Sequence, residues 1–404
     1  MSQPKSAPIS RRDAITGLAA GAASLALPLR AQAQPGPVRV GYAISRTGPW
    51  AGGAQVSQEP NFLLWAEQQN AAGGLNVKGT KRPIELVSYD DRSETETCVR
   101  TYQKLMGSDK VDLILPPWGS TANFAVAPLA NRMGYPMLAP TALSRKLIDM
   151  NLPFFFSFLQ QPDRMMGALV DMLVANNVKT IAIVYMDDLF GLENFAALNN
   201  ALKKTSIQVT DRKSYPLGVK DLSPVLRSLK DQNPDAFIGI TYPPDTILAS
   251  KQAKEIGFNP KFFYASVGTA FQLYRNVMTP AGTEGVLGMG SWNGKTSPGA
   301  KAYFDAHTKK FGGKEPDRWA SGACWASLEV LTAAVGQVGL DRKAIRDYVA
   351  RTEHDTILGK VKFNGSENVA TPGSVSQWQN GEFEVVWPKS IATAALVPAK
   401  PAWK

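Results

Sequence analysis

The sequence is poor in the residues that bind metal ions and form disulfides. Its 404 residues include two histidines, His307 and His354, and two cysteines, Cys98 and Cys324. Neither histidine has a second candidate ligand at metal-binding spacing, which argues against a zinc or haem site, so no metal or cofactor is expected. Both cysteines fall in segments with a helical pattern. We therefore expect two separately buried thiols, and the sequence leaves a disulfide between them open.

Long apolar runs and clusters of basic residues are also scarce. After the first 33 residues, no apolar run approaches the length of a membrane-spanning helix. The net charge is +10, yet the only adjacent lysines are Lys203–Lys204 and Lys309–Lys310, and no arginine stripe occurs. Such spacing does not suit a phosphate backbone, so nucleic acid is not an expected partner.

The N-terminus has the pattern of an export signal. Ser10-Arg11-Arg12-Asp13 precedes an apolar run over 14–29, and Ala31-Gln32-Ala33 supplies the small residues that a signal peptidase needs. The paired arginines and the Ala- and Gly-rich run are similar to a twin-arginine signal. No cysteine lies near the cleavage point, which argues against a lipid anchor. Removal of residues 1–33 would leave a soluble, exported chain of 371 residues with net charge +7; a disordered basic tail is the alternative.

The length and the periodicity of the chain predict its fold class. The length exceeds what one hydrophobic core usually supports, so two lobes are expected. Short β-rich apolar runs alternate with longer helical patterns, which predicts parallel sheets in an α/β, doubly wound fold. Strands are expected at 38–44, 84–89, 111–115, 180–185, 208–214, 236–240 and 262–265, and helices at 122–132, 222–231, 300–311, 319–337 and 342–352.

Three segments interrupt this alternation. The Pro- and Phe-rich segment 152–163 separates two series of strands and helices, so we expect a crossover between lobes there. The Gly- and Pro-rich segment 279–299 is expected to return the chain to the first lobe. Asn380-Gly381, between the short strand patterns 375–379 and 382–387, predicts a two-residue hairpin, so the chain is expected to end on antiparallel structure.

No arrangement of residues predicts catalysis. The segment from Gly288 to Thr296 ends like a phosphate-binding loop, but Met289 stands where the first glycine is required, and Pro298 blocks the following helix. The sequence has no Gly-x-Ser-x-Gly elbow. The acidic pairs Asp90–Asp91 and Asp187–Asp188 each follow a predicted strand, where carboxylates usually cap helices and hold loops. We therefore do not expect an enzyme.

A binding site is better supported, because ligands of open parallel sheets collect at the carboxyl ends of strands. After the predicted strand 111–115, Pro116-Pro117-Trp118-Gly119-Ser120-Thr121 leads into a helix, and free N–H groups and hydroxyls there would suit a carboxylate. An ordinary capped helix is the alternative. Aromatic residues that follow other strands are expected to line one apolar cleft with Trp118: Trp50, Phe190 and Tyr242.

Several short segments also occur in an informative order. They are Arg39–Tyr42, Thr47–Pro49, Asn70–Gly74, Ile84–Val87 with Tyr89–Asp91, Tyr135–Pro140, Ile181–Tyr185 with Phe190–Gly191, and Asp235–Ile238. This ordered set, which covers essentially the whole mature chain, resembles the periplasmic binding proteins of the leucine/isoleucine/valine type. The resemblance implies two doubly wound lobes joined by a three-crossover hinge. It also implies a small ligand gripped as the lobes close and delivered to an ABC permease at the inner membrane.

The resemblance further implies domain limits and surroundings. Lobe 1 is expected at 38–158 plus 288–356, and lobe 2 at 159–287 plus 357–390. Residues 391–404 would form a C-terminal tail, whose end from Pro398 is a candidate for disorder. The protein is expected in the periplasm, without a lipid anchor, as a monomer.

The resemblance places a ligand site position by position. The groups that bind the ligand carboxylate, which we call the carboxylate grip, are implied at Gly119, Ser120 and Thr121, with the backbone around Thr141 nearby. The aromatic residues of the second lobe are implied at Phe190 and Tyr242. The ammonium side departs from the pattern. Leu143 stands where amino-acid binders have a threonine, and Ser266 or Val267 stands where an acidic residue is usual. An ammonium group buried without a carboxylate is costly.

Two ligand classes therefore stay open. One is a branched-chain or other apolar amino acid, and the other is an aromatic or aliphatic carboxylate that lacks an amino group. Two other kinds of protein also remain as alternatives, an exported two-lobed enzyme and a ligand-sensing receptor domain that works with a separate partner.

Overall fold

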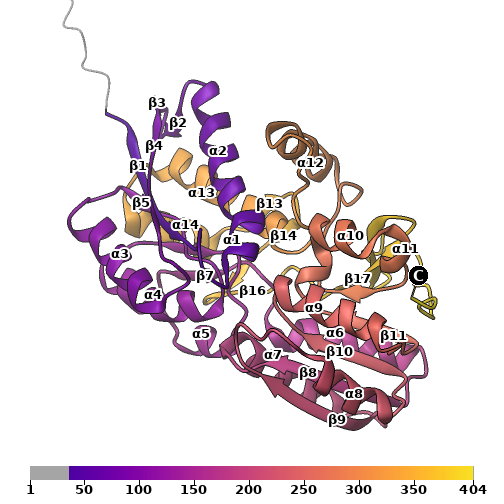
Figure 1. The fold of residues 1–404 in the computed structure, drawn as a ribbon. Coiled ribbons are helices and arrows are strands. Elements are labelled where there is room, and N and C mark those ends of the chain that lie inside the picture. The colour runs from indigo at the N-terminus through magenta and orange to yellow at the C-terminus, as the bar shows by residue number, and fades with distance from the viewer. Residues whose placement is uncertain (1–35, 404) are drawn as a thin grey trace, which may run out of the picture. The chain divides into compact units, whose positions relative to one another are not determined.

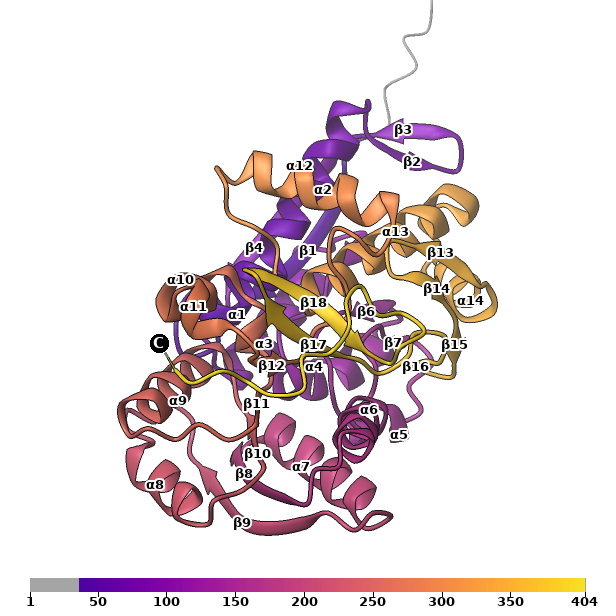
Figure 2. The ribbon, with the colours of Figure 1, turned by 90° about the vertical axis from the view of Figure 1, so that its right-hand side faces the viewer.

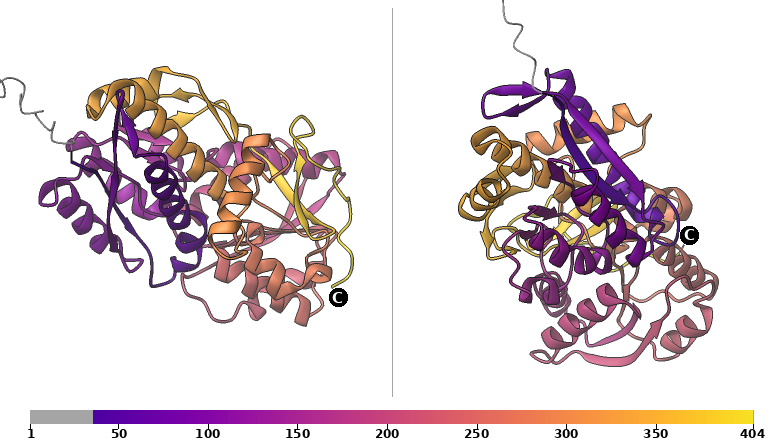
Figure 3. Two further views of the ribbon diagram at one scale, coloured as in Figure 1. Left: turned by 90° about the horizontal axis from the view of Figure 1, so that it is seen from above. Right: turned by 90° about the vertical axis from the view of Figure 1, so that its left-hand side faces the viewer.

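The described chain is organised around two sets of parallel strands with helices packed against them (Figure 1). The computed structural model describes residues 36–403, so the export signal predicted at 1–33 lies outside the described residues. Figure 3 shows the indigo N-terminal strands and the yellow C-terminal hairpin on opposite sides of the left-hand view. The α/β class and the doubly wound sheets predicted from the sequence are confirmed.

The first set of strands begins with a three-stranded parallel sheet. β1 (Val38–Ile44) lies between β4 (Ile84–Asp90) and β5 (Leu113–Ile114). Nearly every residue of β1 is buried, because helices such as α3 (Thr95–Gly107) cover the strand. The regular part of β5 is shorter than predicted, although backbone bonds from Asp112 and Leu115 to β1 continue the pairing on both sides.

A four-stranded sheet completes the first set. β6 (Met137–Ala139) and β7 (Phe155–Ser157) pair in parallel. The later strand β16 (Glu367–Asn368) joins the other side of β7, and β15 (Phe363–Asn364) pairs with β16. Residues more than 200 positions apart in the chain thus share one sheet.

The second set is a seven-stranded sheet with the order β18-β17-β12-β11-β10-β8-β9. Its parallel strands are β8 (Thr180–Met186), β9 (Gln208–Tyr215), β10 (Ala236–Ile240), β11 (Phe262–Ala265) and β12 (Leu287–Gly288). The predicted hairpin, β17 (Val375–Gln379) and β18 (Glu382–Trp387), adds the antiparallel edge (Figure 2). Its turn residues Asn380 and Gly381 have φ of 52° and 81°, the left-handed conformations that a two-residue hairpin requires.

The chain passes between the two sets of strands three times. The passes follow β7, β12 and β16, as the strand pairings show. The exact lobe limits predicted from the sequence stay a prediction. Within the range assigned to lobe 2, β15 and β16 pair with β7 of the first set, whereas β17 and β18 join the seven-stranded sheet.

Helices form the connections between strands, and several of them begin directly after a strand ends. Besides α3, the helices between residue 36 and β12 are α1 (Ala51–Ser57), α2 (Glu59–Ala71), α4 (Ser120–Arg132), α5 (Arg145–Asp149), α6 (Pro162–Ala175), α7 (Leu189–Leu202), α8 (Ser223–Asp231), α9 (Pro243–Glu255), η1 (Gly268–Ala270), α10 (Gln272–Met278) and α11 (Pro280–Thr283). After β12 come α12 (Pro298–Lys310), α13 (Ala320–Val338) and α14 (Arg342–Arg351). Two small hairpins, β2 (Leu75–Val77) with β3 (Thr80–Arg82) and β13 (His354–Thr356) with β14 (Gly359–Val361), complete the set.

The end of the chain is bound to the seven-stranded sheet. We call residues 391–403 the C-terminal strap. Thr393 donates a backbone hydrogen bond of 2.8 Å to Val385, and Lys400 donates one of 2.9 Å to Lys261. The indole Nε1 of Trp403 donates to the carbonyl of Phe258 at 2.8 Å. The disorder considered for the end from Pro398 is therefore not found in residues 398–403, because these bonds hold them.

Two further findings concern the predicted thiols and membrane spans. Cys98 and Cys324 are both buried and free, as expected.

In the described part of the chain, no single helix is long and apolar enough to cross a membrane. Helices α13 and α14 are long and apolar enough only when they are taken together, and they are bent by 119° relative to each other.

Candidate functional site

Trp118 occupies the loop between β5 and α4 and is almost wholly buried. Its Nε1 donates a hydrogen bond of 2.8 Å to the hydroxyl of Ser57 at the end of α1. The indole lies so close to Gly53 of α1 that a Cβ on that glycine would come within 2.2 Å of the ring. Gly53 is therefore required for the close packing of α1 against this loop.

The predicted carboxylate grip is linked by hydrogen bonds to two neighbouring segments. Gly119, with φ of 86°, donates its N–H to Oγ1 of Thr141 at 3.1 Å. That hydroxyl in turn donates to the side-chain carbonyl of Gln58 at 2.9 Å. The hydroxyl of Ser120 both donates to the carbonyl of Leu143 and accepts from its N–H, each at 3.0 Å. These groups thus bind one another in the structure described.

Thr121 differs from its neighbours in the grip. Its hydroxyl is buried and has no hydrogen-bond partner. A buried hydroxyl without a partner is costly, so it is a candidate contact for a ligand. The indole Nε1 atoms of Trp50, Trp292 and Trp319 are also buried and unpartnered.

The second set of strands contributes two aromatic rings to the same place. Phe190 lies in the first turn of α7, and Tyr242 stands at the N-terminus of α9. Their rings stack with centroids 5.0 Å apart, and the ring of Tyr242 lies 5.4 Å from that of Trp118. Three of the predicted site residues, from strand ends of both sets, therefore form one cluster. We call Trp118, Phe190 and Tyr242 the aromatic cluster.

Asp188 holds this cluster in position. Its Oδ2 accepts a hydrogen bond of 2.8 Å from the hydroxyl of Tyr242, and its Oδ1 accepts one of 2.9 Å from the N–H of Gly191. Burial raises the pKa of Asp188 above its ordinary value, and burial likewise raises the pKa of Tyr242 far above its own. Asp188 acts as a helix cap and an anchor for Tyr242, the role expected from its place after β8.

Ser266 and Trp50, two other predicted site residues, make their hydrogen bonds to residues outside the aromatic cluster. The hydroxyl of Ser266 accepts from the N–H of Thr241 at 2.8 Å and donates to the carbonyl of Thr241 at 2.9 Å. It therefore ties the ends of β10 and β11 together. Trp50 precedes α1, and its backbone N–H donates to the hydroxyl of Ser93 at 3.1 Å.

The structure adds Gln58, Ser57 and Trp319 to the residues of interest. Gln58 and Ser57 connect the end of α1 to Thr141 and Trp118, but no local pattern marks them, because their partners lie far away in the chain. Trp319 follows the buried Asp317, whose carboxylate accepts from three N–H groups at the start of α13. An aromatic residue beside a helix start is the signal that could have identified it.

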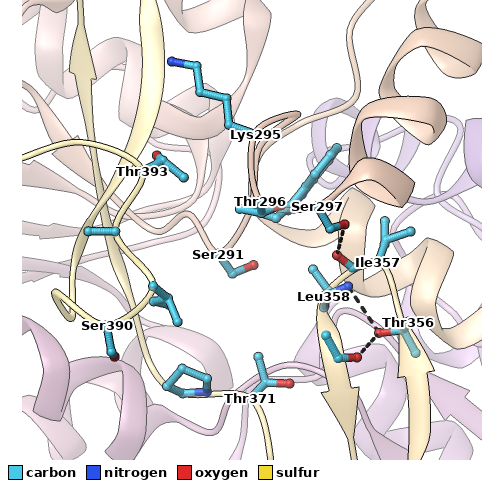
Figure 4. A pocket seen from close by; sticks show the side chains of 15 residues that line it. Ser291, Lys295, Thr296, Ser297, Thr356, Ile357, Leu358, Thr371, Ser390 and Thr393 are labelled. Carbon is cyan, nitrogen blue, oxygen red and sulfur yellow. Dashed lines mark hydrogen bonds between the residues drawn. The ribbon is translucent and has the colours of Figure 1, made fainter.

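A cavity of about 400 Å³ lies elsewhere, between the segment after β12, the β13–β14 hairpin and the start of the C-terminal strap (Figure 4). None of the predicted site residues lines it. Two of the hydroxyls that line it donate to nearby backbone carbonyls. Ser297 donates to Ile357 at 3.3 Å, and Thr356 donates to Gly359 at 2.8 Å. Within residues 36–403, no group of three or more His, Cys, Asp or Glu side chains is arranged to hold a metal ion.

Comparison with known proteins places this arrangement in a family. Residues 37–382 match the family model described as periplasmic binding protein. The Leu/Ile/Val-binding protein homolog 7 of Brucella abortus (strain 2308) is 24% identical over 353 residues, which cover 82% of this chain and 86% of the relative.

Solved structures show the same fold. The leucine binding protein LivK from Thermotoga maritima has a TM-score of 0.76 at 21% identity, covering 86% of this chain and 97% of its own. A solute binding protein of an ABC transporter from R. palustris, in complex with benzoate, has a TM-score of 0.78 at 17% identity, covering 90% and 99%. This chain therefore belongs to the periplasmic binding protein family, and it has the fold of the leucine/isoleucine/valine-binding members.

Proposed function

We propose that the chain is the exported solute-binding component of an ABC uptake transporter and that its ligand binds at the aromatic cluster. The observation that carries the proposal is the meeting of Trp118 with Phe190 and Tyr242 across the ends of two sets of parallel strands. A ligand that contacts both sets stabilises their approach, because it binds the closed arrangement better than the open one. The closed form would then be recognised by permease subunits at the inner membrane.

The ligand is proposed to be small, apolar and to carry a carboxylate. The unpartnered hydroxyl of Thr121 and the N–H groups at the start of α4 are donors suited to carboxylate oxygens. Gly119 and Ser120 now form hydrogen bonds with Thr141 and Leu143. They would either give up these bonds to bind the ligand, or keep them and hold the loop in shape. The apolar body of the ligand would lie against the aromatic cluster.

A branched-chain amino acid is the first candidate, and the names of the relatives support it. A carboxylate without an amino group is the second, and specific observations favour it. Leu143 offers no hydroxyl, both hydrogen bonds of the Ser266 hydroxyl go to Thr241, and each oxygen of Asp188 already accepts a hydrogen bond. An ammonium group would therefore have to displace one of these bonds or lie in the cleft without a carboxylate.

A thermal-shift measurement tests the proposal. The chain from residue 34 is heated alone, with leucine, isoleucine or valine, and with benzoate or a short aliphatic acid. A ligand that binds only the native state raises the melting temperature, and the rise grows with the ratio of ligand concentration to dissociation constant. Stabilisation by leucine but not by benzoate supports the amino-acid class, and the reverse result supports the second class. If no amino acid and no carboxylate raises the melting temperature, the proposed ligand chemistry is wrong.

The variant Thr121→Val locates the site. Because the buried Thr121 hydroxyl has no partner in the protein, its removal should leave the melting temperature of the unliganded chain unchanged or raise it. Binding of the active ligand should weaken about tenfold if that hydroxyl contacts the carboxylate. Ser206→Ala, at a hydroxyl far along the chain before β9, is the matched control and should bind as the unaltered protein does.

Export is proposed to follow the twin-arginine route, which the paired arginines Arg11 and Arg12 indicate. The full chain is expressed with Arg11→Lys and Arg12→Lys together and its cellular fractions are compared with those of the unaltered chain. Retention of the doubly altered chain in the cytoplasm supports the route. Unchanged export would assign the signal to a different pathway.

A further inference from the structure

Glu193 on α7 makes contacts that reach α5, a helix of the other set of strands. Its Oε2 accepts a hydrogen bond of 3.0 Å from the backbone N–H of Arg145, the first residue of α5. Its Oε1 lies 3.7 Å from the Nζ of Lys146. The side chain of Glu193 is 13% exposed, whereas that of Lys146 is 65% exposed. The carboxylate is thus partly withdrawn from water and directed at the start of α5.

The hydrogen bond from Arg145 satisfies a backbone N–H that has no partner within α5. Ser144 stands at the N-cap position, where serine normally accepts a hydrogen bond from the first turn. Here its hydroxyl makes no capping bond and is buried without a partner. The Glu193 carboxylate from α7 therefore satisfies an N–H group at the end of a helix whose own cap is unused.

Arg145 and Glu193 are each linked to residues that we propose bind the ligand. On one side, the residues before Arg145 are Thr141 and Leu143, which are bonded to Gly119 and Ser120. On the other side, Glu193 lies on the helix that starts with the Asp188 cap and Phe190. Asp188 in turn holds Tyr242. A change in the separation of Glu193 and Arg145 must therefore change how the two halves of the site face each other.

The position of Arg145 is fixed from a third direction. Its Nη1 donates to Glu367 at 2.8 Å, and Glu367 also lies 3.2 Å from Nε of Arg164 on α6. Glu367 belongs to β16, just before the last passage of the chain between the two sets of strands. Arg145 is therefore held in place beside the last passage between the two sets of strands. Its backbone N–H thus has a fixed position on the first set, to which Glu193 on the second set bonds.

We propose that Glu193 is a positioning residue for ligand binding, which holds the loop 141–145 against α7 when the two sets of strands close. The inference rests on the proposed function in that binding requires this closure. The backbone bond to Arg145 is the main contact, because an exposed lysine at 3.7 Å contributes little. The ligand itself need not touch Glu193.

The test measures closure directly. Spin labels are attached to cysteines introduced as Glu96→Cys on α3 and Arg227→Cys on α8, two exposed positions that lie with different sets of strands. The native cysteines are buried and are not labelled under native conditions. Pulsed electron resonance then gives the distance distribution without additions and with saturating leucine or benzoate. The labelled chain is compared with Glu193→Ala, Glu193→Gln and Glu255→Ala versions.

The expected result separates these variants. Glu193→Ala should reduce the ratio of the short to the long separation about tenfold, the effect of losing one hydrogen bond to a charged acceptor. Glu193→Gln keeps an acceptor oxygen and should restore most of the ratio. Glu255→Ala removes an exposed carboxylate at the end of α9 and should change nothing. For whichever probe binds, the dissociation constant should weaken about tenfold in Glu193→Ala, mainly through faster dissociation.

Two results would overturn the proposal. One is a distance distribution of Glu193→Ala that equals that of the unaltered chain in every condition. The other is an unaltered chain that never shows the separation found in this structure. If neither leucine nor benzoate binds, the proposed ligand classes fail, but the label distances measured without additions still decide the role of Glu193. Circular dichroism of each variant shows whether it is folded.

Discussion

The hydroxyl of Tyr242 donates a hydrogen bond of 2.8 Å to Asp188, and this bond joins the loop after β10 to the loop after β8. The ring of Tyr242 is thereby held between Phe190 and Trp118. An anionic acceptor makes the bond stronger than one between neutral groups. The orientation of the aromatic cluster thus depends on a carboxylate that is itself partly buried.

Tyr242→Phe keeps the ring and removes only this hydroxyl. Asp188 would then lose a donor in a buried position, so its pKa should rise further. We expect the free energy of unfolding at pH 7 to fall by about 1–3 kcal/mol. The loss should be smaller at acidic pH, below the raised pKa of Asp188, because the protonated carboxyl is no longer an anionic acceptor. Urea unfolding at pH 7 and at a series of lower pH values measures the difference. Tyr274→Phe removes a bond to the neutral hydroxyl of Ser250 and should show no such pH dependence.

Two neighbouring glycines of α1 should respond in opposite ways to alanine. A Cβ at Gly53 would overlap the Trp118 ring, so Gly53→Ala should lower the free energy of unfolding by about 1–3 kcal/mol and weaken ligand binding. A Cβ at Gly52 would meet only Pro244, at 3.7 Å, which is ordinary contact. Gly52→Ala should therefore be neutral or stabilising by about 0.5–1 kcal/mol. Equal effects of the two changes in urea unfolding would contradict the packing described here.

Ser120→Ala tests whether the loop after β6 depends on the start of α4. The change leaves both the N–H and the carbonyl of Leu143 without their partner. We expect a loss of about 2 kcal/mol in the free energy of unfolding, measured by chemical denaturation. Thr121→Val, at the next residue, removes an unpartnered hydroxyl and should cost much less. A loss of similar size at both positions would mean that the hydroxyl of Ser120 is not bonded as described.

Glu329 on α13 should make stability fall as the pH rises. Burial raises its pKa from 4.5 to about 7, although its Oε2 accepts a hydrogen bond from the N–H of Ile357. The folded chain therefore binds this proton more tightly than the unfolded chain. The resulting stabilisation is complete below about pH 4.5 and is lost as the pH rises through about 7.

The variant Glu329→Gln isolates this effect, because it keeps an acceptor oxygen and does not titrate. Relative to the unaltered chain, it should gain on the order of 3 kcal/mol in the free energy of unfolding between pH 4.5 and pH 8. Chemical denaturation at a series of pH values gives the difference. Parallel curves for the two proteins would show that Glu329 is not buried in the way described. The exposed Glu255, altered to Gln, serves as the control.

Periodicity and turn chemistry predicted much of the fold. The hairpin around Asn380-Gly381 is a local signal, since the turn needs left-handed residues at two adjacent positions, and it was located to the residue. Strands such as 38–44 and 236–240 were also placed correctly, because 236–240 is a continuous buried apolar run and 38–44 is interrupted only by Arg39. The pairing of β16 with β7 was not foreseen, because two-residue strands carry no pattern of their own.

The candidate site was predicted less completely than the fold. Aromatic residues at strand ends indicated Trp118, Phe190 and Tyr242, which the structure brings together. The partners that orient the loop, Gln58 and Ser57, were missed, since a polar residue at a helix end gives no sign of a contact some 60 to 80 positions away. The same limit applies to Glu193, whose contact with Arg145 depends on how two helices approach.

The C-terminal strap has a consequence for the order in which the chain is completed. The seven-stranded sheet takes its edge hairpin from 375–387 and is also bound by Lys400 and Trp403, which follow the hairpin in the chain. Most of that sheet is already present in the growing chain, but its edge at β12 stays unpaired until the hairpin arrives. An open strand edge of this kind is prone to pair with other chains. Translation that stops before residue 375 would therefore leave a chain whose sheet can pair with other chains at β12.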